Sequence, residues 1–176
     1  MNRFVISAGC FLVIASPALA ESMGEKTGVN STLGISPRTS DFVAEAAISD
    51  KFEIQASQLA TQRSDDATKT FAQQMISDHQ KTTADLKELV ESKKVSAVIP
   101  SDMDSAHKKM LDKLSGLNGA DFTKQYHDDQ VSAHKDAVSL FQRYAKGGRN
   151  AALKTWASQT EPTLEHHLQM ANDLDR

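Results

Sequence analysis

The feature that most constrains this chain is a helical period in its apolar residues, which extends over four long segments. In residues 40–63 the apolar side chains recur at helical spacing, and the same spacing continues in 64–93, 120–146 and 151–175. A period of about 3.6 residues places such side chains on one face of a helix, where they can pack against other helices. The sequence therefore predicts an all-α protein built from four long amphipathic helices.

Residues typical of helix ends separate these segments. Asp65 and Asp66 come where the second segment starts, and acidic residues favour the first turn of a helix. Gly147 and Gly148 follow the third segment, because glycine tolerates the left-handed conformation found after many helices. Asn150 is a suitable N-cap for the last segment. The joins within each pair are short, so the helices of each pair are expected to be antiparallel.

Residues 94–119 form a much longer connection between the two pairs. Pro100 and Ser101 open a short helix within it, which ends at Gly116. Such a connection can travel the length of a bundle, whereas an ordinary up-down bundle needs only a few residues there. We therefore expect a ferritin-like four-helix bundle with a long crossover that carries a short extra helix. In this arrangement the helices of residues 64–93 and 120–146 run parallel.

Residues 1–20 have the features of a secretory signal peptide. A basic start and an apolar run precede the small residues Ala18 and Ala20, which suit a cleavage site after Ala20. Cleavage there removes Cys10, the single cysteine of the chain, so disulfides and thiol chemistry are not expected in the mature protein. A lipid anchor on Cys10 is the weaker alternative, because the apolar run continues beyond it. We expect a periplasmic or secreted protein.

The expected mature chain divides into a lead-in and one domain. Residues 21–39 are rich in Gly, Ser and Thr and predict a flexible segment, while residues 40–176 form the bundle. The formal net charge is −3, and the basic residues are interspersed with acids, so no nucleic-acid partner is expected. After residue 20 no segment is apolar enough to span a membrane. A protein partner and a homo-oligomer both remain open.

Each predicted long helix carries a polar side chain on its apolar face. His79 lies in the middle of the apolar stripe of residues 64–93, where a leucine would fit the pattern. The candidates on the other three helices are Glu53 with Asp50 at the edge of its face, Gln130 with His134, and His167. These residues lie at similar distances from the nearest turn, so their side chains are expected at one level of the bundle.

Carboxylate and imidazole groups at one level of a helical bundle are typical of a metal site. We expect one divalent transition-metal ion (Zn, Mn, Fe or Cu), held by Glu53, His79, His134 and His167, with Asp50 and Gln130 as hydrogen-bond partners of these ligands. Neutral imidazole and ionised carboxylate can offset the desolvation of such a cation.

The alternative is that these side chains are structural core residues. A histidine on an apolar face is often satisfied by a hydrogen bond to a carbonyl or another side chain. Glu53 could form a buried ion pair with a protonated His79. His107 shows how weak the pattern alone is, because it also falls on the apolar side of the short helix, where no site is expected. Asp78 and Glu165 are expected to be solvated at the margins of their faces.

Motifs for other chemistry are absent from the sequence. It contains no glycine-rich phosphate loop, no Cys-x-x-Cys-His haem motif and no nucleophile elbow. With no nucleophile or substrate indicated, an enzyme is the weakest of three interpretations. The first is an exported bundle that binds a metal ion for storage, buffering or protection against oxidants. The second is a metal-free envelope or stress-related protein-interaction module.

Four stretches of the chain also resemble a known family. These are "DFVAEAAISDKFEIQASQLA", "FAQQMISDHQKTTADL", "DQVSAHKDAVSLF" and "LEHHLQMANDL", in this order. They are similar to the bacterial family catalogued as domain of unknown function 4142, whose members are often labelled predicted outer membrane proteins. The resemblance spans Asp41 to about Leu174 and implies a ferritin-like bundle without an established activity.

The sequence departs from the pattern of ferritin-like di-iron proteins, which use two Glu-x-x-His motifs. Ile76 stands three residues before His79, and Leu164 stands three residues before His167. A single-metal or metal-free core is therefore expected rather than a di-iron centre.

Overall fold

The computed structural model describes residues 28–174, and within this range the chain is helical, with no strand. The predicted all-α class is confirmed. The expected signal peptide of residues 1–20, with its cleavage site, lies outside the described residues. The helices are α2 (Val29–Thr32), α3 (Thr39–Arg63), α4 (Asp66–Glu91), α5 (Ser105–Ser115), α6 (Gly119–Gly147) and α7 (Ala151–Leu174).

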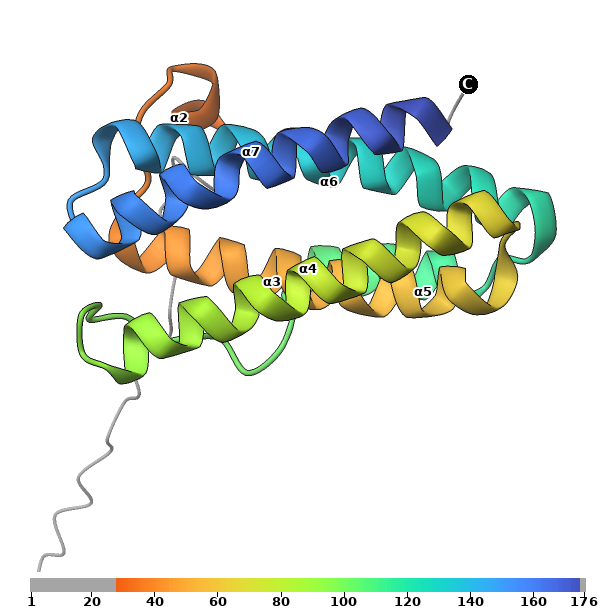
Figure 1. Cartoon of the computed structure of the whole chain (residues 1–176), viewed down its shortest axis with the longest axis horizontal. Helices are drawn as coiled ribbons and strands as arrows, with labels where there is room; N and C mark the ends of the chain where they lie inside the picture. The colour runs from red at the N-terminus through yellow and green to blue at the C-terminus, as the bar shows by residue number, and fades with distance from the viewer. Residues whose placement is uncertain (1–27, 175–176) are drawn as a thin grey trace, which may run out of the picture.

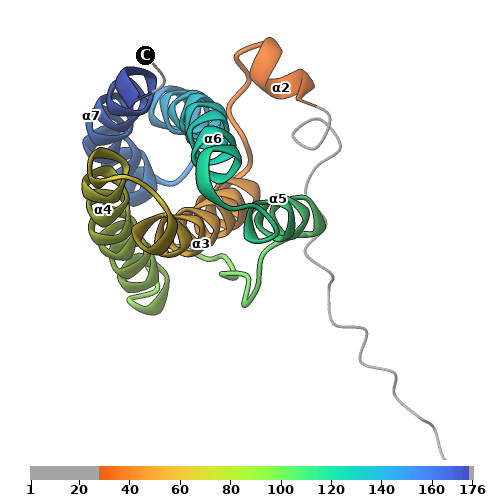
Figure 2. The same ribbon diagram turned by 90° about the vertical axis from the view of Figure 1, so that its right-hand side faces the viewer.

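Two antiparallel hairpins, α3 with α4 and α6 with α7, lie side by side (Figure 1). The colour gradient of Figure 1 shows that α3 and α7 run in one direction, and that α4 and α6 run in the opposite one. The chain between α4 and α6 therefore returns along the bundle, as its length predicts. Figure 2 shows the four long helices around a common centre, with α5 on the outer side of α3 and α6.

The ends of the helices agree with the sequence in most places, and Asp65 and Asn150 act as N-caps. Asp65 Oδ1 accepts a hydrogen bond from the Thr68 amide at 2.8 Å, and Asn150 Oδ1 accepts one from the Leu153 amide at 3.0 Å. Both bonds satisfy amides that have no partner within the helix.

Two predicted helix ends are wrong in their details. The short helix starts at Ser105 rather than at Pro100, because Asp104 Oδ1 caps the His107 amide at 2.8 Å. Gly148 does not adopt the left-handed conformation, since its φ is −61° and its ψ is 147°. Its lack of a side chain serves packing instead, because a Cβ at this position would lie 2.5 Å from the ring of Tyr144.

The described part of the segment predicted to be flexible, residues 28–38, contacts α6. Ser31 Oγ lies 3.0 Å from Ser139 Oγ, and Arg143 Nη1 donates to the Ile35 carbonyl at 2.7 Å. These contacts are hydrogen bonds rather than apolar packing, so the apolar pattern of the sequence does not reveal them. No helix in residues 28–174 has both the length and the apolar character needed to cross a bilayer.

The core consists of two apolar clusters, one toward each end of the bundle. The Phe42 cluster contains, among others, Phe42, Leu86, Phe141, Tyr144, Trp156 and Leu164. The Tyr126 cluster contains, among others, Phe52, Phe71, Met75, Phe122, Tyr126 and Ala171. Along α4, α6 and α7 the residues of the two clusters are separated by buried polar ones. We call this polar level the histidine layer, consisting of Asp50, Glu53, His79, Gln130, His134 and His167.

Candidate metal centre

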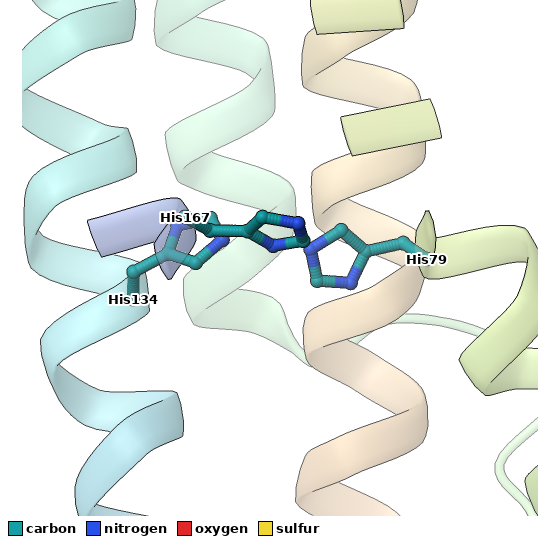
Figure 3. Close-up of side chains that lie close together, drawn as sticks. All are labelled: His79, His134 and His167. Carbon is teal, nitrogen blue, oxygen red and sulfur yellow. The ribbon is translucent and has the colours of Figure 1, made fainter. Parts of the chain in front are cut away.

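Three histidines meet in the middle of the bundle, each from a different helix. His79 comes from α4, His134 from α6 and His167 from α7, and their rings converge in Figure 3. One ring nitrogen of each lies within 4.8 Å of those of the other two. All three residues are buried, with exposed fractions of 3%, 1% and 1% in the same order.

The second nitrogen of each ring is bonded to an acceptor that fixes the ring's orientation. The bonds join His79 Nδ1 to Asp50 Oδ1 at 2.8 Å, His134 Nδ1 to the Gln130 carbonyl at 2.9 Å, and His167 Nε2 to Asp78 Oδ2 at 2.8 Å. In neutral imidazole one nitrogen donates a hydrogen and the other carries a lone pair. A ring that donates to these acceptors therefore has its lone pair on the opposite nitrogen.

Those opposite nitrogens have no hydrogen-bond partner among the described residues. They are His79 Nε2, His134 Nε2 and His167 Nδ1, and all three are shielded from solvent. An unpaired buried polar atom costs free energy, so most such atoms in folded proteins are bonded to a protein group, a water or an ion. Three of them in one place could hold a single cation as nitrogen ligands.

Asp50 is well supported as the partner of His79. Its Oδ2 accepts hydrogen bonds from Thr82 Oγ1 at 2.9 Å and from Thr83 Oγ1 at 3.0 Å. Both hydroxyls belong to the turn of α4 that follows His79. Helix α4 therefore supplies both the imidazole and the two hydroxyl groups that hold the Asp50 carboxylate beside it. A carboxylate behind a metal-binding histidine is a common arrangement, because it fixes the ring and makes it a better electron donor.

Asp78 has the same role toward His167, and the sequence reasoning missed it. Asp78 was expected to be solvated, but its Oδ2 also accepts a hydrogen bond from Gln74 Nε2 at 2.7 Å. Burial would raise its pKa, but the hydrogen bonds from Gln74 and His167 outweigh that effect and lower it. Adjacent helix positions differ by about 100°, so His79 can face α3 while Asp78 faces α7. This rotation between neighbouring positions was the feature of the sequence that could have indicated a contact between Asp78 and α7.

Glu53 does not join the three nitrogens and instead pairs with Gln130. Gln130 Nε2 donates to Glu53 Oε2 at 2.6 Å, while Glu53 Oε1 and Gln130 Oε1 have no partner among the described residues. Burial raises the pKa of Glu53 to about 7, although the nearby His79 and the bond from Gln130 act in the opposite direction. Both residues are almost fully buried.

The three imidazoles differ in their affinity for a proton. Burial lowers the pKa of His79, but the hydrogen bond and charge of Asp50, with the charges of Glu53 and Asp78, outweigh burial and raise it. Burial and the charge on His79 lower the pKa of His134 to about 3. The pKa of His167 is also lowered, mainly by burial. In the metal-free state His79 is therefore the ring that holds a proton most readily.

The dimensions of the group fit one transition-metal ion. Zinc binds imidazole nitrogens at about 2.0–2.1 Å in tetrahedral geometry, which places two ligand atoms about 3.3 Å apart. From a separation within 4.8 Å, the rings need to approach one another by at most about 1.5 Å. The three histidines would occupy three of the four positions of such an ion.

A pocket between α4 and α7 reaches this group from the surface. Its volume is about 290 Å³, and its lining includes Asp78, His79, Thr82, Trp156 and His167. Solvent and small solutes in this pocket can therefore contact the side chains of His79 and His167, which line it.

The other histidines lie outside the group. His107, which the apolar pattern placed inward, bonds through Nδ1 to Asp104 Oδ1 at 2.9 Å and packs against Phe52. His127 is buried and lies 2.9 Å from Thr68 Oγ1 through Nε2. His166 is exposed, as its position in α7 predicts. Glu165 also lies at the surface, where Gln142 Nε2 contacts it at 3.2 Å.

Fold and site together define the class: an all-helical protein with three buried histidines that could hold a metal ion. The chain belongs to the family described as domain of unknown function (DUF4142), whose model matches residues 24–174. The family indicated by the four sequence stretches is thus confirmed. No curated protein and no solved structure gives a significant match to the chain.

Proposed function

We propose that this protein binds one divalent transition-metal ion through His79, His134 and His167. Two observations carry the proposal: one ring nitrogen of each histidine lies within 4.8 Å of those of the other two, and each ring has one hydrogen-bonded nitrogen and one that is buried and unpaired. An imidazole has two polar nitrogens, and in a purely structural core both are usually paired. Three rings that share the same unpaired side are better explained by a common ligand.

The charges around the histidines support a divalent cation. Asp50 stands behind His79 and Asp78 stands behind His167, so two carboxylates lie directly outside the ligand shell. Their two negative charges can balance the two positive charges of the ion in a buried site. His134 is held by a backbone carbonyl, which fixes its ring without adding charge.

The donor set narrows the choice of metal. Imidazole suits Zn, Cu and Fe, whereas Mn is usually bound by oxygen ligands. With three histidines and no pair of Glu-x-x-His motifs, the site fits one ion rather than a di-iron centre. One ion per chain suits metal buffering or protection against oxidants better than bulk storage.

The helix order and the first residues complete the proposal. Two antiparallel hairpins joined by a connection along the bundle are typical of ferritin-like proteins, and we assign the bundle to that group. The basic start, apolar run and small residues of 1–20 favour export, so we place the site in the periplasm or outside the cell.

Metal analysis of untagged, exported protein tests this function. The protein is purified without chelator, its metal content is measured, and thermal melts are recorded with Zn, Mn, Fe and Cu. We expect about one ion per chain and a higher melting temperature with at least one metal. His134→Leu should lose both effects, while His127→Leu should keep them, because His127 lies on the same helix outside the group. A wild-type protein that responds to none of the four metals would refute the proposal.

A further inference from the structure

Two more unpaired atoms lie in the histidine layer besides the three nitrogens. Glu53 Oε1 and Gln130 Oε1 are both acceptors, both are shielded from solvent, and neither has a partner among the described residues. The hydrogen bond from Gln130 Nε2 to Glu53 Oε2 keeps the two side chains next to each other. A cation alone would satisfy the nitrogens and leave these oxygens without hydrogen-bond donors.

The two oxygens belong to residues about one helical turn from Asp50, the partner of His79, and from His134 itself, and both lie on the same side of the layer. Glu53 follows Asp50 by three positions in α3, and Gln130 precedes His134 by four positions in α6. At about 1.5 Å per residue these offsets are about 4.5 Å and 6 Å along the helix axes. Because α3 and α6 run in opposite directions, both offsets point toward the Tyr126 cluster.

Axial offsets of this size are comparable with the reach of a water molecule bound to the ion. A metal–oxygen bond of about 2.1 Å followed by a hydrogen bond of about 2.8 Å spans roughly 5 Å. We infer that the ion carries a water molecule in its fourth position, which donates hydrogen bonds to Glu53 Oε1 and Gln130 Oε1. The inference rests on the proposed function. One hydrated ion would then satisfy all five unpaired atoms of the layer.

On the opposite side of the layer lie the pocket between α4 and α7 and Trp156, whose Nε1 is a donor without a partner among the described residues. There the Phe42 cluster begins with Leu86, Ala137 and Leu164, which have only apolar side chains. A buried water needs two to four polar partners, and the two unpaired acceptors of the layer, Glu53 Oε1 and Gln130 Oε1, lie on the other side. The water is therefore assigned to the side of Glu53 and Gln130.

Glu53 is, on this view, a positioning residue rather than a metal ligand. Its carboxylate lies outside the group of three nitrogens, and its Oε2 is already bonded to Gln130 at 2.6 Å. The fourth position is then open to exchange, and small anions such as azide should replace the water.

Electron paramagnetic resonance of the copper-loaded protein in water enriched in oxygen-17 tests the inference. We expect coupling to three imidazole nitrogens, line broadening by oxygen-17, and a spectral change on addition of azide. Glu53→Gln should keep the nitrogen couplings and the broadening. Removal of a hydrogen-bond partner outside the ligands typically weakens metal affinity about 10- to 100-fold, which is the range expected for Glu53→Leu.

The outcomes separate this inference from the proposed function. Absence of nitrogen coupling and of any metal response means that the proposed site itself is wrong. In a second outcome, the wild type shows three nitrogen couplings but no oxygen-17 broadening, and broadening appears only in Glu53→Leu. This result would mean that Glu53 is the fourth ligand, and it would overturn the inference while leaving the proposed function intact. Asp129→Asn is the matched control. Asp129 is a buried acid next to Gln130 that bonds to Gln125 outside the layer, and its substitution should leave the spectra unchanged.

Discussion

Two buried histidines of α6, His127 and His134, differ in how their nitrogens are used. His127 lies beside the Tyr126 cluster, where its Nε2 is 2.9 Å from Thr68 Oγ1. His134 lies in the histidine layer, where its ring packs against two other imidazoles and its Nε2 has no hydrogen-bond partner within residues 28–174. Both residues are buried, so burial alone does not separate a structural histidine from a candidate ligand. The feature that distinguishes the candidate ligand is an unpaired nitrogen on a ring that packs against other rings with unpaired nitrogens.

The same contrast holds for the two regions around these residues. In the Tyr126 cluster, polar groups are joined in pairs, as in the bond between Ser57 Oγ and Tyr126 Oη at 2.8 Å. The histidine layer instead leaves five polar atoms unpaired. Buried polar atoms in folded proteins usually have a partner, so these five atoms are candidates for binding an ion or a water.

The largest expected effect is the loss of metal-dependent stabilisation in His79→Leu. A metal that binds only the folded wild type should stabilise it by roughly 2.7 kcal/mol at a free concentration a hundred times Kd. Leucine fits the apolar stripe and cannot bind a metal, so the mutant should fold and show no such shift. Thermal melts of both proteins with and without metal measure the difference. An equal shift in the mutant would remove His79 from the ligand set.

The second-largest expected effect is a loss of stability in metal-free His127→Leu. This change leaves the Thr68 hydroxyl without its imidazole partner, and an unsatisfied buried group costs about 1–3 kcal/mol. The shift in melting temperature caused by metal should be the same as in the wild type. His166→Leu, at an exposed position, serves as the control and should stay within about 0.5 kcal/mol of the wild type. A metal response lost with His127 would break the contrast between the two regions.

The dependence of metal affinity on pH follows from the raised pKa of His79. This ring must lose its proton before it can bind an ion. Affinity should therefore rise about tenfold per pH unit below the pKa of His79 and level off above it. His134, whose pKa is lowered to about 3, is already neutral in this range. Calorimetric titration in buffers of different ionisation enthalpy should detect release of at least one proton per ion, and no release would contradict the assignment.

In the metal-free protein, the stabilising contribution of His79 should decrease as the pH rises, whereas metal affinity increases with pH. Because the pKa of His79 is raised in the folded protein, its contribution to stability is fully present below the pKa of the unfolded chain. That contribution is lost as the pH rises through the folded value. Denaturation of the metal-free wild type and of His79→Leu across this range should show the difference narrowing as the pH rises. A difference independent of pH would mean that the proton is not held by His79.

The helical period predicted the helices and the inward direction of the polar residues, because both depend on rotation about a single helix. His79, His134 and His167 were found in this way. Contacts between helices depend also on height and side-chain conformation, which one sequence does not contain. For this reason Glu53 was expected as a ligand but pairs with Gln130, and Asp78 was expected to be solvated but holds His167.

The smallest expected effect is on metal affinity when Asp78 is replaced. It separates two roles of this carboxylate, which are to orient the His167 ring by a hydrogen bond and to supply a negative charge near the ion. In Asp78→Asn the side-chain oxygen can still accept the hydrogen bond from His167 Nε2, so the ring keeps its orientation and loses only a nearby negative charge. The Asp78 side chain is 26% exposed, so solvent screens part of that charge. We therefore expect metal affinity to fall by no more than about tenfold, near the lower limit for partners outside the ligands. Asp78→Ala removes the acceptor as well and should weaken binding further. Titrations of both variants measure the two contributions separately, and equal affinities for wild type and Asp78→Ala would show that His167 needs no carboxylate to serve the site.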